Sequence, residues 1–399
     1  MGEKRDPTEE ALLALLRASL AGEKASAYGE RLGEILPLAN AHAVTPLLYE
    51  PLAPLPEEPA GPWRELQEKA ERCAAQYYRL LAVTQRWTAC LEAAGIPTAL
   101  LKGAGAARAY PVPEMRKSGD VDLLLLHWED LDRAREVLLG AGASLDEEQH
   151  ARHHVGFRLP EGMELELHIE LTEEFRDRRA DQGLRRARED LAAGVAPREV
   201  FPRVSLPLLD DGGQALSLLL HMLGHFRGSG FGVKLLCDWT AFWRHPIPKD
   251  QLDWYLRVVE DCGLAGFSAG VTQVCVEALG LPEEPVRPLL AQAAVSPETR
   301  DALLEEILRS EEFGKTGGGR MVLVRSAGLT GYAREFHRQT RRNFPRGSRC
   351  PLLWPGLWAA TLVRFLRNNR KLRGVKTGAV LRSAADRSKL AKGLDLFQQ

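Results

Sequence analysis

Two carboxylates, Asp120 and Asp122, stand two residues apart in the apolar run GDVDLLLL. Successive side chains of a strand point to opposite faces, so the two aspartates share one face. A strand this apolar is expected to be buried, and buried aspartates are costly unless a cation meets them. Mg²⁺ prefers oxygen ligands and commonly binds one or two carboxylates together with substrate phosphates. The pair predicts a metal and phosphate site; the alternative is an exposed strand start whose aspartates pair with Arg116 and Lys117.

A glycine turn precedes the aspartates. Residues 96–102 read as a strand that runs into Gly103 and Gly105, and residues 104–110 read as a short helical piece. Glycine lets the backbone approach an anion, and the first amides of a helix can bind one. The segment therefore predicts a phosphate-binding turn, and an ordinary tight turn is the alternative.

A third carboxylate is available on a later strand. Residues 163–170, MELELHIE, alternate strictly between apolar and polar side chains, and residues 153–159 with the turn 160–162 read as the first arm of a hairpin. One face of the later strand carries four polar residues: Glu164, Glu166, His168 and Glu170. This face could supply a metal ligand, or it could be the solvated side of an antiparallel strand.

Three histidines lie close together before this strand, at His150, His153 and His154. Zinc is the metal that such a group would suggest, but no cysteine is near and the spacing fits no standard zinc site. His168 taken alone is more typical of a packed or hydrogen-bonded residue than of a ligand. We therefore expect no zinc site from the sequence.

The ordered set of motifs resembles the poorly characterised nucleotidyltransferase family of the polymerase β-like superfamily. The resemblance rests on the core motifs Leu-Lys-Gly, Tyr-Pro, Arg116, GDVDLL and Glu-Leu-His, and it continues into NAHAVTPLLY, LHMLGH and KLLCDW. It covers roughly residues 10–290. The fold that it implies is α+β, a small polymerase β-like sheet flanked by N-terminal and C-terminal helical regions.

By position, the resemblance assigns catalysis and metal binding to Asp120, Asp122 and Glu166. It implies Mg²⁺ or Mn²⁺ as cofactor and an NTP as donor substrate. Ala104 departs from the serine or second glycine that many superfamily members have after the first turn glycine, which weakens the phosphate-binding argument. The nucleotide-binding residues that we expect are Lys102, Gly103, Ala104, Arg116, Ser118 and Lys234.

The predicted activity is transfer of an NMP from an NTP to a hydroxyl or similar group of an unidentified acceptor, with release of pyrophosphate. Two metal ions would stabilise the pyrophosphate and activate the acceptor. Two alternatives stay open: a catalytically degenerate member that binds a nucleotide or peptide, and a toxin-like transferase that acts on transfer RNA. The expected acceptors are a small molecule, a peptide or a protein.

Composition indicates a globular chain of 399 residues with 45% hydrophobic residues. Its six cysteines show neither metal spacing nor a disulfide framework, and no apolar run is long enough to span a membrane, so we expect a cytoplasmic protein. The start, DPTEE, predicts a helix capped by Asp6. Four regions are expected: helical residues 1–95, a nucleotidyltransferase core at 96–200, helical residues 201–313 and a basic segment at 314–399.

The basic segment holds nineteen Lys and Arg against three acidic residues, so the rest of the chain carries a net charge of about −17. It could dock on this acidic body and frame the nucleotide pocket. It could instead bind RNA through its clustered positive charges, or rest on an anionic membrane surface through the apolar, Trp-bearing residues 351–366.

Overall fold

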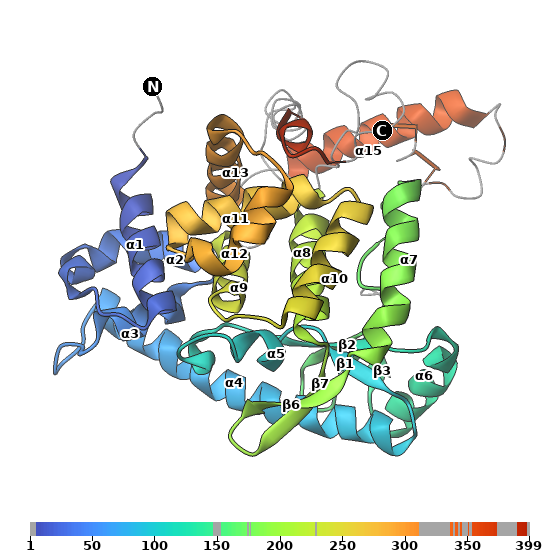
Figure 1. Cartoon of the computed structure of the whole chain (residues 1–399), viewed down its shortest axis with the longest axis horizontal. Helices are drawn as coiled ribbons and strands as arrows, with labels where there is room; N and C mark the ends of the chain where they lie inside the picture. The colour runs from blue at the N-terminus through green and yellow to red at the C-terminus, as the bar shows by residue number, and fades with distance from the viewer. Residues whose placement is uncertain are drawn as a thin grey trace.

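A computed structural model describes residues 5–146, 153–173, 175, 177–227, 230–310 and 353–372, together with residues 336–337, 340–341, 344, 350 and 389–396. Its architecture is α+β, as predicted (Figure 1). Seven strands form one mixed sheet in the order β3-β4-β5-β2-β1-β7-β6. The strands are β1 (Thr98–Leu100), β2 (Asp120–Leu125), β3 (Ser144–Leu145), β4 (His154–Arg158), β5 (Glu164–His168), β6 (Ala196–Phe201) and β7 (Val204–Leu208).

Strand β2 lies near the centre of the sheet. It pairs antiparallel with β1 and parallel with β5, and β5 pairs antiparallel with β4, which confirms the predicted hairpin. The predicted strands at 96–102 and 119–126 correspond to β1 and β2. The last strand of the sheet along the chain, β7, ends at Leu208 and pairs parallel with β1 and antiparallel with β6.

The two faces of the sheet have different neighbours. On one face, Val121, Leu123 and Leu165 are fully buried in a cluster with residues of α4 (Pro62–Ala93) and α6 (Leu131–Gly140). The opposite face packs Leu124 against Leu191 of α7 (Arg178–Ala193), with α8 (Asp211–Arg227) and α10 (Lys249–Asp261) beyond it (Figure 1). Since Asp120 and Asp122 share the face of Leu124, the alternating pattern of β2 turns them toward these later helices.

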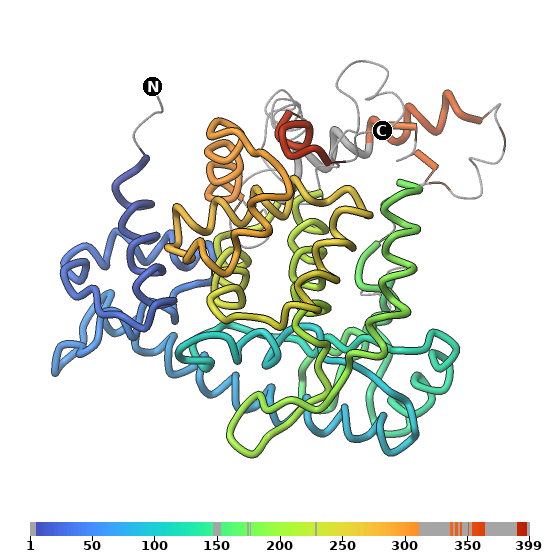
Figure 2. The backbone as a smooth tube through the Cα atoms, in the orientation of Figure 1, coloured from blue at the N-terminus to red at the C-terminus, as the bar shows by residue number. Residues whose placement is uncertain are grey.

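Helices from the two ends of the sequence form one apolar body beside the sheet. Figure 2 shows the first helices next to the later ones, and α1 packs on α11. Helix α1 begins at Pro7, and its cap is the predicted one: the Asp6 carboxylate accepts a hydrogen bond from the Thr8 amide at 2.7 Å. The remaining elements are α1 (Pro7–Ala21), α2 (Leu32–Ala41), α3 (Tyr49–Leu52), α5 (Ala104–Ala107), α9 (Val233–Trp243), α11 (Ala265–Leu279), α12 (Glu283–Gln292), α13 (Pro297–Ser310), α15 (Trp354–Leu372) and the 3₁₀ turns Ser26–Arg31, Thr45–Leu48, Pro113–Met115 and Trp128–Asp130.

The chain returns to this helical body near its end. Residues 389–396 pack on α11, where Leu390 and Leu394 are buried. The contact is so close that a Cβ atom at Gly266 would overlap the Leu394 carbonyl, and one at Gly270 would overlap the Leu394 side chain. Other parts of the basic segment, including residues 314–335 and 373–388, lie outside the described residues.

Among the helices that the structure describes, none is both long enough and apolar enough to cross a membrane.

Candidate active site

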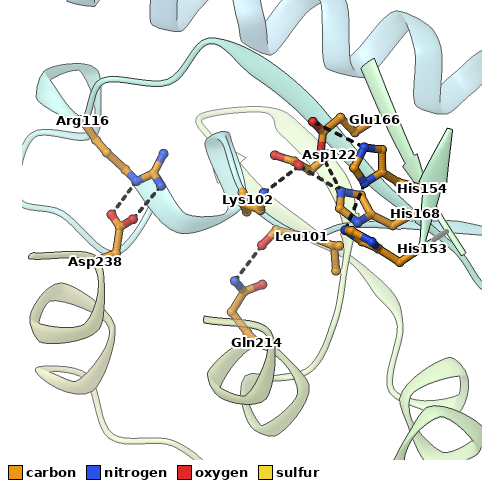
Figure 3. A network of polar contacts seen from close by, with 10 residues as sticks. All are labelled: Leu101, Lys102, Arg116, Asp122, His153, His154, Glu166, His168, Gln214 and Asp238. Carbon is orange, nitrogen blue, oxygen red and sulfur yellow. Dashed lines mark hydrogen bonds and ion pairs between the residues drawn. The ribbon is translucent and has the colours of Figure 1, made fainter. Parts of the chain in front are cut away.

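The parallel pairing of β2 with β5 brings the predicted carboxylates together. Its register sets Asp120 opposite Glu164 and Asp122 opposite Glu166, with His168 two residues further along the same face of β5. Side chains directly opposite each other on neighbouring strands are close enough to interact. The fold thus converts two motifs that are more than forty residues apart in sequence into one polar cluster (Figure 3).

Asp122 is the centre of the cluster and is fully buried. The Lys102 ammonium lies 2.8 Å from Asp122 Oδ1, and His168 Nε2 lies 3.1 Å from the same oxygen and 3.2 Å from Glu166 Oε2. Burial alone would raise the pKa of Asp122, but the Lys102 charge and the hydrogen bond with His168 outweigh it and hold that pKa well below its usual range. The carboxylate is therefore ionised at neutral pH.

The pKa values of the two cationic partners of Asp122, Lys102 and His168, are shifted upward. Burial would lower the pKa of Lys102 and of His168, yet Asp122 and the neighbouring carboxylates raise both pKa values overall. Burial would raise the pKa of Glu166, and the hydrogen bond with His168 lowers it overall. The cluster is thus a network of charges that depend on one another.

Asp120 lies at the start of β2, half-buried beside this network. The negative charge of Asp122 is the main cause of its raised pKa, followed by burial, while Lys102 and Lys234 act in the opposite direction. The charge of Asp122 thus opposes ionisation of Asp120, and a cation bound between the two carboxylates would relieve this repulsion.

A divalent metal fits these residues. One oxygen of Asp122, Oδ2, is buried and has no hydrogen-bond partner among the described residues, which is costly unless a ligand meets it. Ligand atoms of Asp122, Glu166 and His168 also lie within 4.8 Å of one another. Carboxylate ligands suit Mg²⁺ and Mn²⁺.

Gly103 forms the turn between β1 and α5. Its φ of 61° is a conformation that glycine adopts without strain, and a Cβ atom there would lie 3.8 Å from the Asp120 carbonyl oxygen. The turn is therefore held directly beside the start of β2, while Ala104 is buried in α5. The structure brings this predicted turn and the carboxylates together.

Arg116 and Ser118 lie in a second polar cluster, beside the first. Arg116 binds Asp238 of α9 through two contacts, Nε to Oδ1 at 2.7 Å and Nη2 to Oδ2 at 2.8 Å, and Tyr110 donates to the same carboxylate at 2.6 Å. Its Nη1 contacts Ser118 and the Gly103 carbonyl oxygen. With both residues of the ion pair about 95% buried, Arg116 ties the glycine turn to the helical body, which favours a positioning role over direct phosphate contact.

Helix α8 contributes two residues that the sequence reasoning did not single out as functional. His221 and His225 are one turn apart, with ring centroids 4.6 Å apart. Burial and then the nearby Lys102 charge lower both pKa values, to about 4 for His225 and well below the usual value for His221, so both imidazoles are neutral at neutral pH. The sequence feature that could have indicated these residues is the spacing of two histidines four residues apart in an otherwise apolar helix.

The predicted contact residue Lys234 lies on α9, and its charge acts on Asp120, His221 and His225. It therefore belongs to the surroundings of the carboxylates. Gln214 of α8 completes this side by donating to the Leu101 carbonyl at 3.0 Å, which fixes α8 to the end of β1 (Figure 3).

Comparison with known sequences agrees with the geometry. The profile of the family described as uncharacterised nucleotidyltransferase matches residues 29–280, which is more than half of the chain and includes every site residue named above. The chain belongs to this nucleotidyltransferase family. No curated protein matches it significantly. Family membership supports a role in nucleotidyl transfer, with an NTP as substrate.

Proposed function

We propose that this nucleotidyltransferase moves an NMP from an NTP to a hydroxyl or similar group of an acceptor, with Mg²⁺ or Mn²⁺ as cofactor and pyrophosphate as product. The observation that carries the proposal is the register of β2 and β5, which sets Asp122 opposite Glu166 and leaves Asp120 on the same face. Family membership supplies the reaction class.

In this proposal, Asp120, Asp122 and Glu166 hold the metal. The unpartnered Oδ2 of Asp122 and the repulsion between the two aspartates are what a divalent cation would relieve. A bound metal supplies Lewis-acid stabilisation of the charge that develops on the phosphates and on the attacking oxygen.

The chain's own residues prepare this site. Lys102 keeps Asp122 ionised and carries a positive charge at the place where phosphate oxygens would arrive. His168 contacts both Asp122 and Glu166, and so fixes the orientation of two carboxylates from neighbouring strands. Preorganised charge of this kind is effective because it does not have to reorganise during the reaction.

We place the acceptor on the α8 side of the sheet. A neutral imidazole can accept a hydrogen bond from a hydroxyl group, and His221 and His225 are held neutral close to Lys102 and the carboxylates. A small molecule, a peptide or a protein with a free hydroxyl is the acceptor class that we propose for this side.

The test is calorimetric binding of ATP, GTP, CTP and UTP in the presence of Mg²⁺. Wild-type protein and the variant Asp132→Ala, whose side chain is 92% exposed on α6, should bind one or more of these nucleotides. The double variant Asp120→Ala, Asp122→Ala should lose the metal-dependent part of binding while retaining its fold by circular dichroism. Failure of the folded wild-type protein to bind any NTP would contradict the proposal.

Turnover separates transfer from simple binding. A transferase releases pyrophosphate in a Mg²⁺-dependent reaction once an acceptor is present, whereas a degenerate member binds nucleotide without release. Candidate acceptors can be screened with radiolabelled NTP of the base identified by calorimetry. Labelling that also occurs with the double aspartate variant would show that the activity comes from elsewhere.

We further propose that the basic segment can contribute RNA binding, since clustered Lys and Arg supply a salt-dependent attraction to phosphates. Replacing four of its positive residues by glutamine, at Arg364, Arg367, Arg370 and Lys371, should reduce the slope of log affinity against log salt concentration for a single-stranded RNA. An unchanged slope would reject a role for these four residues.

A further inference from the structure

Three histidines from two strands meet beside the carboxylates. His153 and His154 lie at the start of β4, His168 ends β5, and one ring nitrogen of each lies within 4.8 Å of the others. The ring centroids of His154 and His168 are 5.3 Å apart, and those of His153 and His168 are 5.9 Å apart. His168 comes from the neighbouring strand, and His150, the third histidine of the sequence cluster, lies outside the described residues.

The two consecutive histidines are not both part of the regular strand, because His153 immediately precedes β4 (His154–Arg158). Successive side chains of a regular strand point to opposite faces. The amides of Ile169 and Glu170 both donate to the His153 carbonyl, at 2.7 and 3.2 Å, which is the hydrogen-bond pattern of a β-bulge at residues 169–170, opposite His153. Beside this irregular pairing, His153 Nε2 lies 3.1 Å from His154 Nδ1.

That contact has the spacing of two ligands on one ion. Zinc binds imidazole nitrogens at about 2.0–2.1 Å in tetrahedral geometry, which sets two ligand nitrogens about 3.3 Å apart. The 3.1 Å between the two rings is close to this value without any movement of the strand.

The third histidine has the arrangement typical of a metal ligand. His168 is 5% exposed, and its Nε2 contacts Asp122 and Glu166, while its Nδ1 is buried and has no hydrogen-bond partner among the described residues. Histidines that bind metals commonly use one nitrogen for the metal and donate the other N–H to a carboxylate, which orients the ring. His168 therefore has its carboxylate partners in place and one nitrogen left for an ion.

We propose that His153, His154 and His168 form a nitrogen-donor site for one late transition-metal ion of the Zn²⁺ class, next to the carboxylate site and distinct from it. Three imidazoles with a fourth position open to water or substrate are a donor set that suits zinc, whereas Mg²⁺ is held by oxygen ligands. The carboxylates of Asp122 and Glu166 then have two roles, as ligands of the Mg²⁺ site and as partners that orient His168.

The inference does not depend on nucleotidyl transfer. An ion bound by the three imidazoles would be present in a degenerate family member as well, and an active transferase could function without it. Zinc binding and NTP binding are measured separately, so either proposal can fail while the other stands.

The experiment uses the full chain after removal of metals by a chelator. Zn²⁺ is titrated in competition with a chromophoric chelator, and Co²⁺ is added separately so that its visible absorption reports the geometry. We expect one Zn²⁺ per chain and the intense spectrum of a tetrahedral cobalt site. Asp122→Asn removes a carboxylate that orients His168 and should reduce the zinc affinity by ~10–100-fold, the usual cost of losing a ligand's hydrogen-bond partner. The double variant His153→Ala, His154→Ala removes two ligands and should reduce the zinc affinity by more than this.

The matched control is His221→Ala, His225→Ala, which removes another pair of neighbouring histidines, on α8. This variant should retain zinc binding. Loss of zinc in this control with retention in His153→Ala, His154→Ala would overturn the proposal, as would a wild-type chain that binds no Zn²⁺ and gives only the weak spectrum of octahedral cobalt. A larger loss of zinc affinity in Asp122→Asn than in the histidine double variant would place the ion on the carboxylates instead, and would also overturn it.

Discussion

Replacing Asp238 by alanine should both destabilise the protein and weaken nucleotide binding. The substitution leaves the Arg116 guanidinium buried without its carboxylate, together with the Tyr110 hydroxyl that donates to the same group. Removal of one partner of a buried ion pair typically costs about 3–5 kcal/mol, because the remaining charge is left uncompensated. Since Arg116 also contacts the Gly103 carbonyl, the turn beside Asp120 should become less well fixed.

Urea unfolding gives the loss of stability, and calorimetry with Mg²⁺ and the preferred NTP gives the loss of binding. A suitable control is Arg108→Ala, which breaks the more exposed pair of Arg108 with Asp211 and should cost at most about 1 kcal/mol. Adding Arg116→Ala to Asp238→Ala should cost much less than Arg116→Ala alone, because the two residues act as a unit. Equal costs for Asp238→Ala and the control, or strict additivity of the pair, would refute this reasoning.

Three further outcomes are expected. Glu166→Gln should reduce Mg²⁺-dependent turnover by about 10²–10³-fold, the usual effect of removing one preorganised charged or hydrogen-bonding group. Glu164→Gln should reduce turnover less. The opposite order of the two variants in a pyrophosphate-release assay would mean that the wrong carboxylate was chosen. Burial lowers the pKa of His42 to about 4 in the folded protein, whereas the unfolded chain protonates this residue near pH 6.5. As the pH falls from about 6.5 to 4, the unfolded state therefore binds a proton that the folded state does not, and the free energy of unfolding decreases by about 1.4 kcal/mol per pH unit. His42→Gln should flatten the dependence of stability on pH in that window by this amount, and unfolding curves with unchanged slope would argue against it. Gly266→Ala should cost about 1–3 kcal/mol and expose the C-terminal turn to proteolysis, because the new methyl group overlaps the chain packed on α11, whereas Gly140→Ala, with open space around it, should do neither.

Local patterns in the sequence were sufficient for the elements that carry the carboxylates. The alternation in residues 119–126 and 163–170 predicted two strands and the shared face of Asp120 and Asp122, and β2 and β5 confirm both. These predictions succeed because side-chain periodicity is a local property of the chain.

Contacts between distant segments could not be predicted in the same way. The aspartates were expected to pair with Arg116 and Lys117 if the site were merely solvated, yet Arg116 pairs with Asp238 of a remote helix and Lys102 pairs with Asp122. These pairings depend on which helix covers which face of the sheet, and neither charge pattern nor spacing specifies that. The sequence analysis grouped His153 and His154 with His150 and set His168 apart, because the pairing of β4 with β5, which places His154 opposite His168, is a contact between distant segments.

The packing of residues 389–396 on α11 changes how the basic segment should be regarded. Helix α13 ends at Ser310, and Leu390 and Leu394 are buried in the same helical body. The basic segment is therefore covalently connected to two fixed points of one body, so the contour length of the chain limits how far its charges can lie from that body. Any polyanion bound by this segment would be retained near the protein even if each separate contact were weak.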